Sequence, residues 1–87
     1  MVLRRPPYWW EWDLELSPHL LKRMIDRRFT EVDLRSMLHH ARSVGRGLVP
    51  GRWTIRTRHR RRDWEIIVEP DDAARVIVVV TAYPIDG

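Results

Sequence analysis

The chain has 87 residues, of which 44% are hydrophobic and none is cysteine, and its 16 basic and 12 acidic side chains give a formal net charge of +4. This length suits one small domain with a single core, and the lack of cysteine excludes disulfides, thiolate metal sites and catalytic thiols. No apolar run reaches the roughly 20 residues of a membrane span, and no signal-peptide core is visible. We therefore expect a cytoplasmic protein without a membrane partner.

Fifteen of the sixteen basic side chains are arginine. The planar guanidinium fork favours RNA or an acidic protein as a partner, because it matches phosphate and carboxylate oxygens in pairs. Genomic base composition is an alternative origin of this excess, and composition does not decide between the two.

Residues 8–16 alternate in polarity, which predicts a strand or an extended arm lying on a core. One side would carry Trp10, Trp12, Leu14 and Leu16, and the other would carry Trp9, Glu11, Asp13 and Glu15. Interleaved carboxylates repel phosphate, so we interpret these tryptophans as core or partner contacts and not as a platform for bases. An aromatic edge of this kind also leaves homodimerisation open.

The next pattern predicts a helix over residues 18–28, with Ser17 as its N-cap and Pro18 in its first turn. The apolar stripe of this helix contains Leu20, Leu21, Met24 and Ile25. A polar stripe carries one imidazole and two guanidiniums at four-residue intervals, on His19, Arg23 and Arg27. Donors aligned in this way suit an anionic ligand such as a phosphodiester.

A second helix should begin after Thr30, whose hydroxyl can form an approximate capping box with Asp33. Its buried side is predicted to carry Leu34, Met37, Leu38 and Ala41. Three glycines and a proline between residues 43 and 51 then predict a flexible loop.

From residue 52 the period becomes two, and residues 52–58 and 64–69 predict a hairpin with a basic tip. Ile55 would point inward, and Arg56 and Arg58 outward. Residues 75–83 are apolar on both faces, as a central strand would be. The expected fold is α+β: an N-terminal strand or arm, then two helices packed on one face of a three- to four-stranded antiparallel sheet. It forms one domain over residues 1–87, with a tryptophan-rich arm over 1–16.

The run His19-x-x-x-Arg23-Met24-x-x-Arg27, followed by Phe29-Thr30-Glu31-x-Asp33-Leu34, resembles the helical signature of small bacterial proteins related to the RelE and BrnT toxins. Their last strand also ends much as residues 78–84 do here. The resemblance covers about residues 17–84 and implies the fold shared by barnase, EndoU, colicin-type nucleases and RelE, many of which are metal-independent ribonucleases. Arg28 stands where relatives commonly have glycine, and we expect this departure to affect the turn and not the chemistry.

This resemblance implies that His19 transfers a proton or positions phosphate, that Arg23 supports it, and that Thr81 and Tyr83 supply hydroxyl groups. Metal-free RNA cleavage also needs fixed positive charge around the phosphorane and a group that titrates near neutral pH. His19 and His59 are both candidates for the titrating group. The predicted catalytic residues are His19, Arg23, Arg56, Thr81 and Tyr83, and the predicted RNA-binding residues are Arg27, Arg58, His59, Arg60, Arg61 and Arg62.

The expected function is that of a metal-independent endoribonuclease toxin, or of an RNA-cleaving protein derived from one. We expect no cofactor and no metal, because the acidic turn at Asp71 and Asp72 and the adjacent His39 and His40 lack ligand spacing. The expected partners are RNA and an acidic antitoxin or immunity protein. The alternative is a non-catalytic relative of this fold that binds RNA or protein, or that serves as a homodimeric interaction module.

Overall fold

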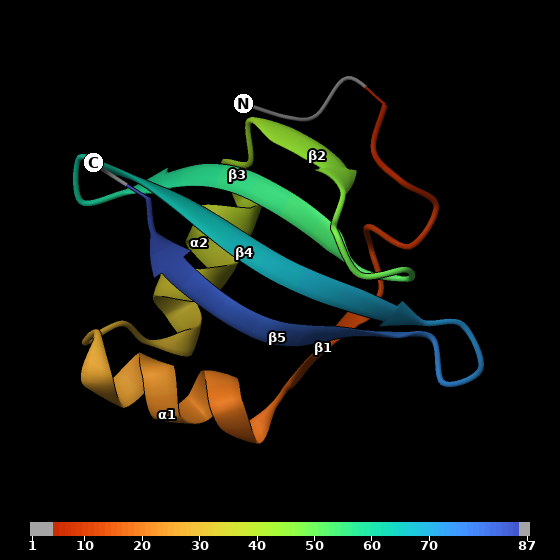
Figure 1. The fold of residues 1–87 in the computed structure, drawn as a ribbon, viewed down its shortest axis with the longest axis horizontal. Coiled ribbons are helices and arrows are strands. Elements are labelled where there is room, and N and C mark those ends of the chain that lie inside the picture. Colours follow the sequence, from red (N-terminus) through yellow and green to blue (C-terminus); the bar gives the residue numbers. More distant parts are fainter. Residues whose placement is uncertain (1–4, 86–87) are drawn as a thin grey trace.

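Two helices and one five-stranded mixed sheet make up the computed structural model, which describes residues 5–85 (Figure 1). The first four residues of the predicted arm lie outside the described residues. The elements are β1 (Asp13–Leu16), α1 (Pro18–Asp26), α2 (Glu31–His39), β2 (Ser43–Arg46), β3 (Trp53–His59), β4 (Arg62–Asp71) and β5 (Val76–Pro84). The strand order is β1-β5-β4-β3-β2, with β1 parallel to β5 and every other pair antiparallel. The predicted α+β class is therefore confirmed.

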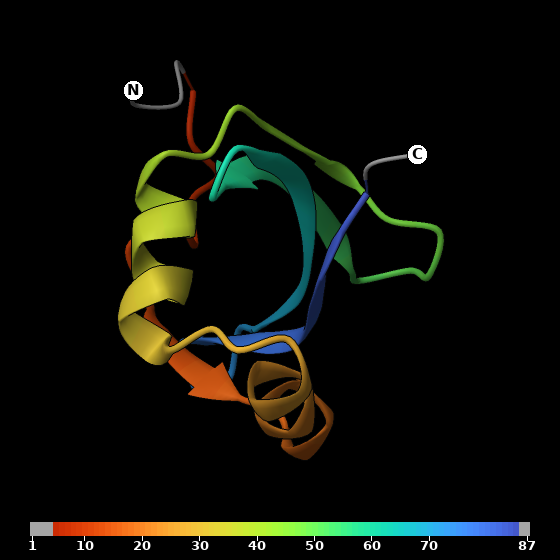
Figure 2. The same ribbon diagram turned by 90° about the vertical axis from the view of Figure 1, so that its left-hand side faces the viewer.

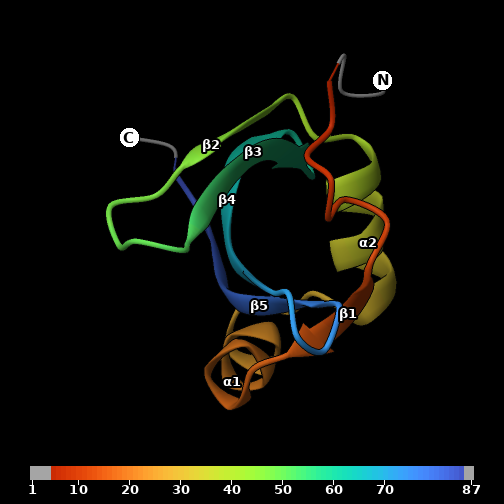
Figure 3. The same ribbon diagram turned by 90° about the vertical axis from the view of Figure 1, so that its right-hand side faces the viewer.

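The sheet curls around the core, as Figures 2 and 3 show, with α2 across its open side and α1 along β5. Helix α2 packs on β3, and α1 packs on β5. Both helices are nine residues long, too short and not apolar enough to cross a membrane. The buried core draws on both helices, on the arm and on β3, β4 and β5: Trp9, Leu20, Phe29, Leu34, Met37, Ala41, Ile55, Trp64, Ile66, Val68, Ile77, Val79 and Ala82.

Helix α1 begins as its sequence predicts but ends two residues early. The Ser17 hydroxyl accepts a hydrogen bond from the Leu20 backbone N–H at 3.0 Å, and Pro18 occupies the first turn. At the other end Arg28 adopts a left-handed conformation (φ 55°), the Phe29 N–H donates to the Met24 carbonyl, and the Arg28 N–H donates to the Ile25 carbonyl. These paired bonds form a Schellman ending, in which glycine is the preferred left-handed residue.

Replacing Arg28 by glycine is expected to stabilise the protein. A left-handed conformation costs an L-residue about 1–2 kcal/mol, a strain that glycine does not have, although glycine loses part of this gain to its greater entropy when unfolded. We expect a net gain of about 1 kcal/mol, or roughly 4–8 °C in melting temperature for a domain of this size. Thermal unfolding followed by circular dichroism measures it, and an unchanged or lower melting temperature would contradict the strain assigned to this position.

Helix α2 starts with the predicted capping box. The Asp33 N–H donates to the Thr30 hydroxyl at 3.1 Å, and the Thr30 N–H donates to the Asp33 carboxylate at 2.8 Å. The hydrogen bond from the Thr30 backbone lowers the pKa of Asp33 below its usual value, and the nearby His59 and Arg60 lower it further. Leu34, Met37 and Ala41 are buried, as their spacing predicts.

The tryptophan-rich arm differs from its prediction. Only residues 13–16 form a strand, and residues 8–12 form turns in which the Trp10 N–H donates to the Pro7 carbonyl and the Trp12 N–H donates to the Trp9 carbonyl, both at 3.0 Å. The turns break the alternation, so Trp9, predicted on the polar side, is only 1% exposed. Its ring packs at 5.6 Å from the ring of Trp53, and Trp10 and Trp12 pack around the core without being fully buried.

Two strand pairings were not visible in the sequence pattern. Residues 43–46, predicted to be part of a flexible loop, form β2 and pair with β3. Strand β1 joins the sheet as a parallel neighbour of β5, whereas the prediction was an antiparallel sheet throughout. Neither pairing follows from the alternation of side chains along the strands. Strand β2 is short and contains Gly45, and the parallel pairing of β1 with β5 depends on the path that the chain takes between these two strands.

The predicted β3–β4 hairpin is confirmed. Ile55 and Thr57 are buried, while Arg56 and Arg58 are exposed on the opposite face. The buried Thr57 hydroxyl donates a 2.6 Å hydrogen bond to the Met37 carbonyl near the end of α2. This bond ties β3 to α2, so the arginines of β3 lie on the outer face of the sheet, away from α2.

Candidate nucleic-acid interface

A row of three polar side chains crosses the outer face of the sheet. Arg56 on β3, Glu65 on β4 and Tyr83 on β5 are neighbours in the strand register. The Tyr83 hydroxyl donates to Glu65 Oε2 at 3.2 Å, and Arg56 Nη2 lies 3.6 Å from Glu65 Oε1. The Glu65 side chain is 14% exposed and that of Arg56 is 61% exposed. We call this set the Arg56–Glu65–Tyr83 row.

The row holds the Tyr83 phenol in its protonated form. Partial burial raises the pKa of Tyr83 above its ordinary value of 10.0, and the negative charge of Glu65 and the hydrogen bond to it act in the same direction. The Arg56 guanidinium opposes this rise. Because a raised phenol pKa favours the neutral form, Tyr83 remains a hydrogen-bond donor throughout the neutral pH range.

A bulge in β5 places Thr81 on the same face as the row. Val68 pairs with Val79 and Ile67 pairs with Thr81, so Val80 is the extra residue of β5. The carbonyl of Val80 accepts a 2.8 Å hydrogen bond from the Ser17 hydroxyl, which also caps α1. The extra residue shifts the alternation by one, so Thr81 and Tyr83 both point outward while Ala82 is buried.

Of the three polar residues predicted on the first helix, only Arg27, the C-cap of α1, contacts this region. Arg27 Nη1 donates to the Ala82 carbonyl at 3.1 Å, next to Tyr83 in β5. Arg23 instead pairs with Asp26 on its own helix at 3.1 Å. His19 is exposed in the first turn, and its imidazole makes no hydrogen bond or ion pair within residues 5–85, so no such contact joins it to Thr81. The roles predicted for His19 and Arg23 stay predictions.

The β3–β4 turn lies against the turn between α1 and α2. His59 pairs with Arg62, so Arg60 and Arg61 alone make the turn, with φ of 52° and 66°. Arg60 Nη1 donates to the Arg28 carbonyl at 3.3 Å, and its Nη2 lies 3.8 Å from Asp33 Oδ2. Arginines just after α1, in this turn and in its strands therefore gather at one end of the molecule. We call them the basic rim: Arg27, Arg28, Arg58, Arg60, Arg61 and Arg62.

His59, predicted to bind RNA, is half-buried beneath the basic rim. Its ring lies edge-to-face at 5.6 Å from the ring of Trp64. Its Nε2 is buried and has no hydrogen-bond partner among the described residues. The imidazole therefore supports the base of the turn by packing on the core, and its RNA-binding role stays a prediction.

Glu65 is a site residue that the sequence analysis missed. Its neighbours Trp64 and Ile66 are buried, so an outward position follows from alternation alone. Its place between a guanidinium and a phenol follows only from the register of three strands. The signal available in the sequence was an acid on an outward position beside a strongly basic strand.

No group of three histidine, cysteine, aspartate or glutamate side chains suited to a metal ion occurs within residues 5–85. Comparisons of the sequence with protein-family models and with curated proteins, and of the structure with solved structures, give no match. The function is therefore inferred from the fold and the site. The protein is an α+β domain whose outer sheet face holds a carboxylate, a phenol and a guanidinium beside a rim of arginines.

Proposed function

We propose that this protein is a metal-independent endoribonuclease, a toxin or a protein derived from one, that acts on RNA in the cytoplasm with the Arg56–Glu65–Tyr83 row as its catalytic centre. The observation that carries the proposal is the position of Glu65, whose carboxylate lies between the Tyr83 hydroxyl and the Arg56 guanidinium. A carboxylate beside fixed donors is a general base next to groups that stabilise negative charge.

The chemistry follows from these three groups. Glu65 takes the proton of the ribose 2′-hydroxyl, the 2′-oxygen attacks phosphorus, and the bond to the 5′-oxygen breaks. Arg56 stabilises the charge of the pentavalent phosphorane, because a guanidinium forks onto two phosphate oxygens and keeps its proton. Tyr83, protonated at neutral pH, gives a proton to the leaving 5′-oxygen. The products are a 2′,3′-cyclic phosphate and a 5′-hydroxyl.

The remaining predicted catalytic residues are assigned to phosphate positioning. Thr81 faces outward on β5 and offers a hydroxyl next to the row. His19 and Arg23 lie on α1, which packs on β5, and they would contact RNA that extends from the row across this strand. Arg27 already reaches the Ala82 carbonyl on the edge of β5, which supports this path.

The basic rim supplies the electrostatic part of RNA binding. Arg58 lies two residues along β3 from Arg56, and Arg27 contacts the carbonyl next to Tyr83, so the rim borders the row. Phosphate contacts by arginine give affinity that falls steeply with salt. The same surface suits an acidic antitoxin, which would compete with RNA for it.

Incubation of the purified protein with total RNA in the presence of a chelator tests the proposal. We expect cleavage without added metal and fragments that end in cyclic phosphate, detected by mapping of the cut ends. RNA binding without cleavage would favour the non-catalytic alternative. Cleavage that stops when the chelator is added would contradict the metal-independent mechanism.

Replacing Arg61 by glycine is expected to raise stability and to weaken RNA binding together. Glycine suits the left-handed turn position, so we expect a gain of about 1 kcal/mol in stability. Loss of one phosphate contact should lower the slope of log affinity against log salt by about one. Arg75 (φ 56°), in the β4–β5 turn, is the matched control. Arg75→Gly should stabilise the protein with unchanged RNA affinity, and equal RNA binding by both variants would contradict a role for the rim.

A further inference from the structure

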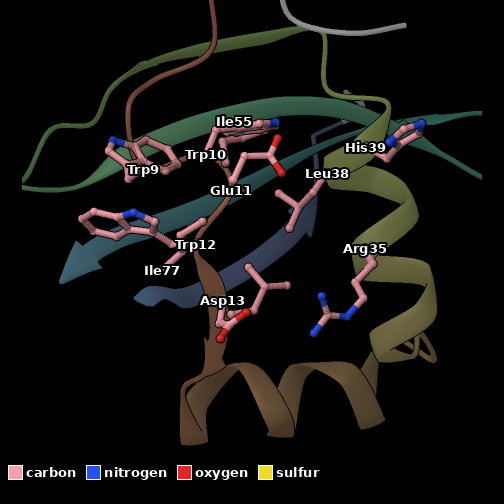
Figure 4. A pocket seen from close by; sticks show the side chains of 11 residues that line it. Trp9, Trp10, Glu11, Trp12, Asp13, Arg35, Leu38, His39, Ile55 and Ile77 are labelled. Carbon is pink, nitrogen blue, oxygen red and sulfur yellow. The ribbon is translucent and has the colours of Figure 1, made fainter. Parts of the chain in front are cut away.

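A second site lies between the N-terminal arm and α2, away from the basic rim. A pocket of about 330 Å³ is lined there by Trp9, Trp10 and Trp12 of the arm and by Arg35, Leu38 and His39 of α2. Figure 4 shows Glu11 and Asp13 at different ends of the same space. This volume is at the lower end of the range for small-molecule sites, so it suits one end of a ligand.

The uncompensated charge of the pocket is negative. The side chains of Glu11 and Asp13 are exposed and make no hydrogen bond or ion pair within the described part of the chain. Arg35 is paired with Glu31 through two nitrogens, Nε at 3.1 Å and Nη2 at 3.0 Å from Oε2, so its charge is already compensated. These two unpaired carboxylates therefore favour a ligand with a positive charge.

The walls of the pocket suit a cation as well. Indole faces attract guanidinium and alkylammonium groups more strongly than other aromatic rings do. A neighbouring indole already holds a guanidinium of the protein itself. The Arg46 guanidinium carbon lies 4.9 Å from the ring centre of Trp53, and Trp53 packs against Trp9. Trp9 is buried and the turns that follow it are held by backbone hydrogen bonds, so the tryptophan walls are formed before a ligand arrives.

We propose that this pocket binds the cationic end of a ligand, a guanidinium or an alkylammonium group, between the indole rings and the carboxylates of Glu11 and Asp13. The group comes either from a free small molecule or from an arginine or lysine side chain of a peptide. The site is independent of the proposed ribonuclease function, because it shares no residue with the Arg56–Glu65–Tyr83 row or the basic rim.

The experiment is a titration of the whole protein, followed by NMR of the five tryptophan indole N–H signals, with agmatine and with a blocked Gly-Arg-Gly peptide as the two probes. We expect the signals of Trp9, Trp10 and Trp12 to shift, with a dissociation constant on the order of 0.1–1 mM. The signal of Trp64, which does not line the pocket, should not move. Equal binding of both probes assigns the site to a free cation, and binding of the peptide alone assigns it to a protein-borne side chain.

Variants separate a cation site from an anion site. The double variant Glu11→Gln and Asp13→Asn should weaken binding by about tenfold or more, while Glu15→Gln, an exposed acid outside the pocket, should not change it. Arg35→Gln should strengthen binding, because it frees the charge of Glu31. Absence of any shift with either probe at about 10 mM overturns the proposal. So does binding of inorganic phosphate that depends on Arg35.

Discussion

Replacing Glu65 by glutamine should lower the rate of RNA cleavage by about 10²–10⁴-fold, the range that a general base contributes. Glutamine has nearly the same shape and can still accept a hydrogen bond from Tyr83, but at neutral pH its amide cannot take up the 2′-hydroxyl proton. The loss should appear in the single-turnover rate with bound RNA, because the substitution removes the base and leaves the basic rim intact.

Glu69 provides the matched control for this variant. It lies four residues further along β4 on the same face and pairs with Arg52 at 3.0 Å, away from the row. Glu69→Gln removes one negative charge from the sheet face without touching the proposed base, so it should leave the cleavage rate within about twofold of the parent. A Glu65→Gln variant that cleaves as fast as the parent protein would falsify the assignment of Glu65 as the base.

Replacing Trp64 by alanine should cost about 3–5 kcal/mol of stability, the usual cost for a large aromatic side chain in a core. Trp64 is 4% exposed and packs edge-to-face against Phe29 at 5.3 Å, which joins the α1–α2 turn to β4. A domain of this size has a free energy of unfolding of about 5–15 kcal/mol in total, so the variant should lose a large part of its stability. Urea unfolding at 25 °C measures the change in the free energy of unfolding.

Trp64→Phe tests whether the stability depends on the aromatic volume at this position. The indole Nε1 of Trp64 is buried and has no hydrogen-bond partner among residues 5–85. Phenylalanine keeps most of the aromatic volume and removes this unpaired donor, so it should cost less than about 1.5 kcal/mol. A similar loss in both variants would contradict this expectation and would mean that phenylalanine does not fill the space of the indole.

Much of the fold could be predicted because its signals are local. The Thr30–Asp33 capping box and the Ser17 cap depend on residues three apart, and both appear in the structure. The alternation of β3 likewise places Ile55 inward and Arg56 outward. The arm was mispredicted where a local pattern was broken, because turns between Pro7 and Trp12 reset the alternation and buried Trp9.

The candidate site depended on separations that a local pattern does not encode. Glu65 follows Arg56 by nine residues and precedes Tyr83 by eighteen, and only the register of β3, β4 and β5 joins them. The face on which Thr81 lies was decided by the bulge at Val80. This bulge is anchored by Ser17, more than sixty residues earlier in the chain.

The sequence by itself determined the class of fold, the caps of both helices, the inward and outward residues of the hairpin, and the excess of arginine. Each of these follows from side chains a few residues apart, whose preferences act within a single element. Only the tertiary structure decided that a carboxylate lies between Arg56 and Tyr83, and that the arginines just after α1 and those of the β3–β4 turn share one end of the molecule. Those placements depend on strand register and chain path, which are set by the packing of the whole core.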